Sequence, residues 1–396
     1  MKKKPIIAFL FIFAMSIVSP IKAQMNFFEG TWAEALALAK KENKFIVLDA
    51  HTSWCGPCKK MKKEIFPQTE VGDFYNKNFI NVAIDMEKGE GPELDKQYNV
   101  QFYPTFLYFN PQGELVHKTL GFKKADEFIE DGKNALDENR QYVSLQKKYR
   151  SGDRNPEMLY HYALAAEAAA SNPYEITQAS DAYLSAVPNE ELLSDKNIDF
   201  ILRTAYDKKS KAFGKMSELS TAIMEKVGKE KFISTVTNVL MNDVSEAVET
   251  DNPAQYLWAI TYAQANFSEY SEQICGSLAM YYYTQREEWN EYANEAANYI
   301  GKFAMEKSNV LNNAAWTFYE HIDEPAKLEE ALAWSKKSLS LENNYYNADT
   351  YAALLYKLGR KNEALRAAEE AIILGKNEGM DISETENLLE KIKLLE

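Results

Sequence analysis

Hydrophobic and polar positions follow one pattern in the first third of the chain and another in the rest. Between residues 26 and 136, short apolar runs rich in β-branched and aromatic residues predict strands at 45–50, 79–85, 105–109 and 115–119. Amphipathic stretches between these runs predict helices at 31–41, 61–66, 93–98 and 124–136. The second of these helices should stop or kink at Pro67. The alternating order predicts an α/β fold, in which a mixed sheet carries helices on both faces.

After about residue 140 the strand pattern stops, and helical stretches rich in Ala, Tyr, Glu and Lys follow one another. Residues 331–341 recur in similar form at 364–374, and a helix ending at Gly359 precedes the second copy. Both copies carry small residues where two helices must approach closely, which predicts packed helical hairpins at about 310–376.

These hairpins resemble the tetratricopeptide repeat. The first copy departs from that pattern, because its turn is expected to be longer, at 321–330, and Trp316 matches the aromatic position only approximately. A weaker candidate lies at 289–303, and residues 142–285 give no repeat register. The helices are expected to form either a plain scaffold or a concave surface that binds a peptide or protein partner.

The N-terminal segment has the layout of a secretory signal. Three lysines in residues 1–4 precede an apolar run at 6–18, and the small residue Ala23 precedes the expected cleavage site. The run is short for a membrane span, so a retained anchor is the alternative, and no other stretch is apolar enough to span a bilayer. We expect a signal peptide at 1–23, an α/β domain at 24–140 and an all-α domain at 141–396. The mature protein is expected to be exported and soluble, in the periplasm of a Gram-negative bacterium.

Charge and cysteine count exclude other classes of protein. The net charge of −14 argues against nucleic acid as a partner, because phosphate binding requires clustered positive charge. An exported chain of 396 residues with three cysteines is not a disulfide scaffold, so its stability must come from its core.

Two of the cysteines, Cys55 and Cys58, are separated by Gly56 and Pro57. A structural zinc site needs four ligands, yet the chain has no second cysteine pair and its four histidines are scattered. A purely structural disulfide would constrain little, because it closes a two-residue loop. Redox chemistry is the third hypothesis, and the position of the cysteine pair in the chain favours it.

The position of the pair explains why redox chemistry is favoured. The pair lies at a predicted strand-to-helix junction, where free N–H groups and the helix dipole stabilise a thiolate on Cys55. Pro57 fits a first-turn position, at which no N–H donor is missed. Cys55 can then attack a substrate disulfide, and Cys58 can resolve the mixed disulfide.

Residues 49–59 read DAHTSWCGPCK, which resembles the active-site segment of thioredoxins. The resemblance covers roughly residues 28–138 and implies a thioredoxin-like fold. It implies that Asp49 is a buried acid accepting the proton of Cys58, and that Pro104 is cis, so that the backbone of Tyr103 can pair with an extended substrate. Gly121 matches the glycine after the last strand. The substrate-binding face implied by the resemblance comprises Trp54, Gly56, Pro57, Tyr103, Pro104 and Gly121.

Two positions depart from the thioredoxin pattern. His51 stands where thioredoxins usually carry Trp, and when protonated it would stabilise the Cys55 thiolate, the alternative being a packing or surface histidine. Asn81 stands where cytoplasmic thioredoxins have a buried lysine near the acid, so it is a second residue that would retune the site. The insertion at 87–92 and the opening helix with Trp32 resemble the domains of exported thiol:disulfide interchange proteins.

The Gly56-Pro57 dipeptide is the type found in reducing thioredoxins, so we expect reduction of protein disulfides, with a membrane reductant as one candidate for the electron donor. The only redox group expected is the reversible Cys55–Cys58 disulfide, without a cofactor or metal. One alternative is an adaptor or chaperone-like repeat protein whose cysteine pair is a redox switch, and another is a disulfide oxidase or isomerase. The third cysteine, Cys275, is expected to be a buried and inert thiol on a helix.

Overall fold

Four strands form one mixed sheet in the order β2–β1–β3–β4 in the computed structural model, which describes residues 24–395. β1 (Phe45–His51) runs parallel to β2 (Phe79–Asp85) and antiparallel to β3 (Thr105–Phe109), and β3 pairs antiparallel with β4 (Leu115–Leu120). All four strands were predicted to within one residue at each end, and the mixed α/β sheet is confirmed. The predicted signal peptide at 1–23 lies outside the described residues.

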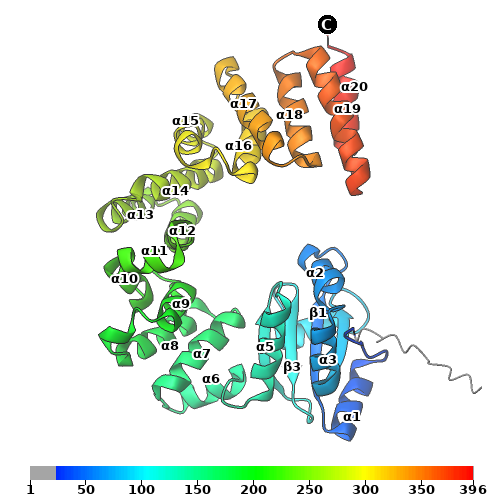
Figure 1. The fold of residues 1–396 in the computed structure, drawn as a ribbon, viewed down its shortest axis with the longest axis vertical. Helices are drawn as coiled ribbons and strands as arrows, with labels where there is room; N and C mark the ends of the chain where they lie inside the picture. Colours follow the sequence, from blue (N-terminus) through cyan, green and yellow to red (C-terminus); the bar gives the residue numbers. More distant parts are fainter. Residues whose placement is uncertain (1–23, 396) are drawn as a thin grey trace, which may run out of the picture. The chain divides into compact units, whose positions relative to one another are not determined.

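Helices cover both faces of this sheet, as the element order predicted (Figure 1). Because side chains alternate along a strand, Ile46, Leu48 and Ala50 of β1 pack on one face with Trp32, while Val47 packs on the other with Tyr75. The helical segments of this part of the chain are α1 (Trp32–Glu42), α2 (Gly56–Lys60), the π-helical turn η1 (Met61–Ile65), α3 (Thr69–Asn78), α4 (Gly91–Tyr98) and α5 (Ala125–Leu136).

Helix α3 was missing from the sequence prediction. The chain leaves the helical conformation after η1, as Pro67 predicted, and a separate helix then begins at Thr69. Val71 and Tyr75, four residues apart, are fully buried on its inner side.

Three further helices, α6 (Tyr142–Arg150), α7 (Pro156–Ala168) and α8 (Pro173–Ala186), belong to the same compact unit as the sheet, which ends at Val187. Both α6 and α7 contact β4. The backbone N–H of Tyr142 at the start of α6 donates a hydrogen bond to Nδ1 of His117 on β4, over 3.1 Å. Burial lowers the pKa of His117 to about 3, so the ring is neutral and can accept this bond. The strands end before residue 140 as predicted, while the boundary between an α/β domain at 24–140 and an all-α domain at 141–396 stays a prediction.

The second compact unit begins at Pro188 and, within the described residues, is entirely helical. None of the helices in residues 24–395 is long and apolar enough to cross a bilayer. The helices of this unit are η2 (Asn189–Glu191), α9 (Asp195–Thr204), α10 (Lys211–Glu218), α11 (Ser220–Val227), α12 (Lys229–Glu249), α13 (Pro253–Asn266), α14 (Ser271–Gln285), α15 (Trp289–Tyr299), η3 (Ile300–Ala304), α16 (Ser308–His321), α17 (Pro325–Leu341), α18 (Tyr345–Lys357), α19 (Lys361–Glu378) and α20 (Ser383–Lys393).

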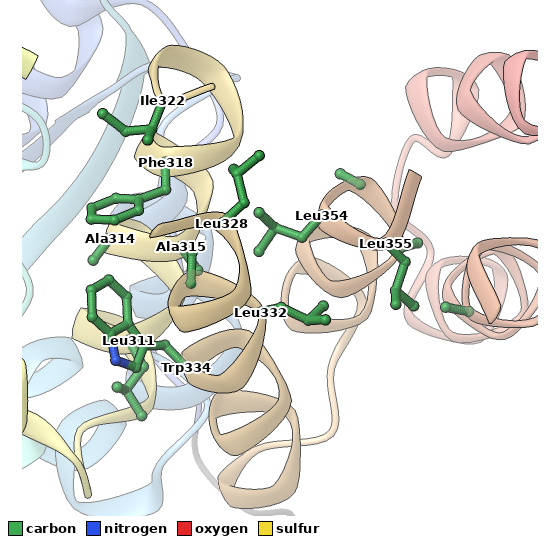
Figure 2. Close-up of a cluster of buried hydrophobic side chains, with 14 of the residues drawn as sticks. Leu311, Ala314, Ala315, Phe318, Ile322, Leu328, Leu332, Trp334, Leu354 and Leu355 are labelled. Atoms are coloured by element: carbon green, nitrogen blue, oxygen red, sulfur yellow. The ribbon is translucent and has the colours of Figure 1, made fainter. Parts of the chain in front are cut away.

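The predicted hairpins correspond to α16 with α17 and α18 with α19, and α16 also contacts α18. Figure 2 shows the shared core, in which side chains of α16, α17 and α18 gather in one cluster. The sequence repeat has a packing basis, because equivalent positions of its two copies are completely buried: Ala331 and Ala364, Ser335 and Ala368, Ser338 and Ala371. Assignment of these hairpins to the tetratricopeptide repeat stays a prediction.

The expected long turn at 321–330 is wrong. α16 ends at His321 and α17 begins at Pro325, so the turn has the same length as the turn between Lys357 and Lys361 in the second hairpin. Proline fits the first turn of a helix, where its missing N–H is not needed, and Leu328 is buried in the shared core. The helix expected after residue 330 therefore begins earlier, at Pro325.

Candidate active site

The cysteine pair lies where β1 passes into α2. Cys55 caps the helix, and its Sγ accepts a hydrogen bond from the backbone N–H of Cys58 over 3.1 Å. Pro57 occupies the first turn, as its missing N–H donor predicted. The two cysteines are joined in a disulfide. In the reduced state the same N–H groups would face a Cys55 thiolate, which is the arrangement that lowers a thiol pKa.

The peptide bond between Tyr103 and Pro104 is cis. Pro104 directly precedes β3, and Thr105 of that strand lies opposite Ala50 near the end of β1. Pro104 and the segment that carries the two cysteines therefore lie at the same end of the sheet. Gly121, which follows β4, donates its N–H to the carbonyl oxygen of Pro104 over 2.8 Å and has a φ of 82°, a conformation that favours glycine.

Aromatic residues lie around this end of the sheet. Trp54 is 64% exposed, and its ring meets the ring of Tyr103 edge-on at 6.0 Å between centroids. The Trp54 indole N–H donates to Glu87 over 2.9 Å, and the Tyr103 hydroxyl donates to Asp95 over 2.8 Å. Burial, with the hydrogen bond to Asp95, raises the pKa of Tyr103 to about 12, so the hydroxyl stays protonated.

The disulfide itself is much less exposed than the residues beside it. Cys55 is 3% and Cys58 is 7% exposed, whereas Gly56 and Pro57 are open to solvent. Phe102, which the sequence analysis did not single out, is 59% exposed. Sequence reasoning also missed Glu87 and Asp95, since only the fold brings their carboxylates to the aromatic side chains.

Asp49 lies on the same face of β1 as Val47, and it is 7% exposed. Its Oδ1 accepts no hydrogen bond from any residue of the described chain. Burial raises the pKa of Asp49 to about 6, while the positive charges of His51 and Lys62 act in the opposite direction. A carboxylate with this pKa is ionised at neutral pH and can take up a proton.

His51 lies beside Asp49. Its Nδ1 is 3.8 Å from the Asp49 carboxylate and 3.3 Å from the Asp49 carbonyl oxygen. His51 can therefore act on the cysteine pair indirectly, because a positive charge on its ring lowers the pKa of Asp49. Direct stabilisation of the Cys55 thiolate stays a prediction.

Asn81 is buried and is hydrogen bonded to the N-terminal part of the chain. Its side-chain amide donates to the carbonyl oxygen of Asn26 over 3.0 Å and to Oδ1 of Asn76 over 2.9 Å. The strand partner of Asp49 on β2 is Ala83. The positive charge that this site lacks at position 81 comes instead from Lys62, which sequence reasoning missed because it follows the cysteine pair on η1.

Exchange of Lys62 for methionine is expected to raise the pKa of Asp49, because the variant loses a positive charge that favours the carboxylate. The measurement is a titration of the Asp49 carboxyl carbon by NMR. Lys63→Met is the matched control, since Lys63 is the adjacent exposed lysine and the charges that lower the Asp49 pKa are those of His51 and Lys62. Equal pKa values in Lys62→Met and the unaltered protein would rule out this contribution.

The pKa of Asp49 also predicts how stability changes with pH. Its pKa lies near 6 in the folded protein and near 3.8 in the unfolded chain, so stability is lost as pH rises through that window. Asp49→Asn should stabilise the sheet by about 2–3 kcal/mol at pH ~7.5 and by much less at pH ~4. Hydrogen exchange of β1, corrected for intrinsic rates, measures the gain, and the exposed Asp73→Asn is the control. A gain that is the same at both pH values would contradict the assignment.

Cys275 lies on α14, far along the chain from the pair. Its thiol donates to the carbonyl oxygen of Ile260 over 3.7 Å, and burial raises its pKa to about 11. It is half-buried and takes part in no disulfide. Within residues 24–395, no three His, Cys, Asp or Glu side chains form a group that could hold a metal ion.

A thioredoxin-like domain profile matches residues 32–135. Thioredoxin H4 of Arabidopsis thaliana is 35% identical over 95 residues, which make up 24% of this chain and 75% of that protein. The chain belongs to the thioredoxin-like family. This family of thiol–disulfide oxidoreductases uses a cysteine pair like Cys55 and Cys58 and needs no cofactor.

Other thioredoxin-like relatives match the same part of the chain. The thiol:disulfide interchange protein DsbD of Pseudoalteromonas atlantica is 29% identical over 107 residues, which cover 26% of this chain and 18% of that protein. A solution structure of a candidate disulphide-isomerase from Bacteroides thetaiotaomicron is 41% identical, with 29% of this chain and 95% of that chain covered and a TM-score of 0.28. The chain spans about half the length, 54%, of thioredoxin-2 of Pyricularia oryzae.

Proposed function

We propose that this protein reduces disulfides in other proteins by dithiol–disulfide exchange. The observation that carries the proposal is the Cys55–Cys58 disulfide at the start of α2, at the same end of the sheet as the cis proline Pro104. A buried acid, Asp49, lies on the strand that leads into the pair. Together these groups supply a nucleophile, a resolving thiol and a proton acceptor.

The reaction starts from the reduced pair. The Cys55 thiolate attacks one sulfur of a substrate disulfide, forms a mixed disulfide and releases the other substrate sulfur as a thiolate. Asp49 takes the proton of Cys58, whose thiolate then attacks Sγ of Cys55. The second substrate thiolate leaves and the Cys55–Cys58 disulfide forms, so that two electrons have passed to the substrate. A dithiol donor must then reduce the pair for the next turnover.

The Gly56-Pro57 dipeptide supports reduction over oxidation. We expect a reduction potential well below the value of about −120 mV that is typical of a strong oxidant such as DsbA. Equilibration with glutathione measures it, and a potential near that oxidising value would contradict the proposed direction.

We propose that the helical unit holds the proteins on which the pair acts. It has no cysteine pair of its own for the exchange reaction, whereas its packed helices offer a surface to which a protein can bind. The basic and apolar segment at 1–23 supports export to an oxidising compartment, in which a membrane reductant would supply the electrons.

The Cys58→Ser variant tests the exchange reaction directly. It retains the attacking thiol but lacks the resolving one, so the mixed disulfide with a substrate should persist and be isolated without reductant. Mass spectrometry of the captured species identifies the substrates. The matched control is Cys55→Ser with Cys58→Ser, which should capture nothing. If both proteins capture the same species, Cys55 is not the attacking group.

A further inference from the structure

A cavity of about 580 Å³ opens on the second unit, between α16, α18 and the start of α20. Its volume is within the range of roughly 300–1,000 Å³ that is typical of pockets for organic ligands. The side chains that line it are Asn312, Asn313, Trp316, Thr317, Tyr345, Tyr346, Asp349, Thr350, Asp381, Ser383 and Glu384.

The charge of this lining is entirely negative. Asp349, Asp381 and Glu384 supply three carboxylates, and no lysine, arginine or histidine is among the lining residues. Elsewhere in this unit carboxylates have cationic partners, such as Glu329 with Arg360. Within residues 24–395, none of the three pocket carboxylates forms an ion pair.

Asp349 is the most buried of the three carboxylates. The hydroxyl of Thr385 donates to its Oδ1 over 2.6 Å, which fixes the position of the carboxylate. Burial raises the pKa of Asp349, and the negative charge of Glu384 raises it further. A cation in the pocket would compensate both effects.

A further acceptor in the wall is without a partner. The Oδ1 atom of Asn312 is buried and accepts no hydrogen bond from the described chain, which is costly for a buried polar atom. Three aromatic side chains also line the pocket: Trp316, which is partly buried, Tyr345, which is 6% exposed, and Tyr346, which is 59% exposed. Aromatic faces attract organic cations as well as apolar groups.

Acceptors, carboxylates and aromatic faces together favour an organic cation that carries N–H donors. A metal ion fits less well, because no three carboxylate or histidine side chains of residues 24–395 lie close enough to ligate one. Tyr346 and Asn313 are exposed at the edge, so a long side chain can enter while its backbone remains outside.

We propose that this pocket binds a lysine or arginine side chain of an extended, basic segment of a partner protein. The ammonium or guanidinium group lies among Asp349, Glu384 and Asn312, and its aliphatic stem lies against Trp316 and Tyr346. The pocket thereby defines the chemistry of the proteins that the helical unit holds, and in this respect the inference rests on the proposed function.

The test measures binding of a fluorescein-labelled peptide of repeated glycine, serine and lysine by fluorescence anisotropy. The full chain carries Cys55→Ser and Cys58→Ser, so that thiol exchange at the pair cannot contribute to the measured binding. The lysine peptide should bind, and peptides with glutamate or acetyl-lysine at the same positions should not. Asp349→Asn with Glu384→Gln should weaken binding by about tenfold or more, as expected for lost charge-assisted hydrogen bonds.

A matched variant separates the pocket from the general negative charge of the protein. Glu370→Gln with Glu390→Gln removes the same charge from exposed positions of α19 and α20 outside the pocket and should bind the lysine peptide normally. Equal weakening in the two double variants would overturn the proposal. Binding of spermidine without binding of the lysine peptide would also overturn it, because the ligand would then be a free amine.

The same variants distinguish this inference from the proposed function. With both cysteines restored, Asp349→Asn with Glu384→Gln should reduce a small disulfide at the normal rate. Peptide binding by a chain that has no reductase activity would contradict the proposed function and leave the pocket's ligand as stated.

Discussion

Cys55→Ser is expected to lower the rate of insulin reduction with dithiothreitol to that of the reductant alone. Cys55 caps α2 and receives the N–H of Cys58, so it is the sulfur that the helix start stabilises as a thiolate. Serine can occupy the same position, but its hydroxyl cannot form the mixed disulfide that the exchange requires. The measurement is the turbidity of the released insulin B chain over time.

The control for this experiment is Cys275→Ser, which removes the other thiol outside the pair. Cys275 is half-buried and its raised pKa keeps it protonated, so the variant should reduce insulin at the normal rate. Turnover that persists in Cys55→Ser but disappears in Cys275→Ser would place the chemistry on the helical unit. Turnover absent in the unaltered protein would favour the adaptor alternative.

The second large effect is on stability. Phe128→Ala should destabilise the sheet-containing unit by about 3–5 kcal/mol, the usual cost of deleting a fully buried phenyl ring. The Phe128 ring is completely buried, stacks on Tyr75 at 4.2 Å and meets Phe106 at 4.7 Å between centroids. Amides of β1 and β3 should then exchange with deuterium roughly 10²- to 4 × 10³-fold faster, as measured by mass spectrometry.

Phe102→Ala is the matched control, because it makes the same chemical change at a side chain that is 59% exposed. It should leave the exchange of β1 and β3 within about a factor of two, since exposed substitutions usually change stability by less than ~0.5 kcal/mol. Equal acceleration in both variants would mean that the ring cluster around Phe128 does not limit opening of the sheet.

The strands could be predicted from the sequence because each is an isolated apolar run between turn residues, as at 105–109 before the Asn110 turn. Helix α3 could not be predicted in the same way. Pro67 indicates the end of a helix, and the ten residues of α3 are the whole segment from Thr69 to the start of β2, with no turn to separate helix from strand. The turn of the first hairpin was misplaced for a related reason. Pro325 was read as part of the turn, whereas proline is also favoured at a helix start.

The candidate site was predictable where its residues lie in one short segment or at a special backbone position. Cys55, Cys58 and Asp49 fall within ten residues, and Pro104 and Gly121 have the conformations expected of proline and glycine at a constrained turn. Lys62, Glu87 and Asp95 carry no local signal. Their effects on Asp49, Trp54 and Tyr103 arise from distances that only the folded chain defines.

The edges of the two outer strands, β2 and β4, decide whether an unfolded chain can pair with this sheet. A free strand edge offers unpaired N–H and C=O groups to which another chain can add as a further strand, which leads to aggregation. Here α6 and α7 contact β4 at one edge. At the other edge Phe27 bridges to Asn81 of β2, and the N–H of Phe28 donates to the Asn81 carbonyl oxygen over 2.7 Å. Both outer strands are therefore partly covered, so the exchange with extended polypeptides proposed above would take place beside a sheet that offers them little free edge.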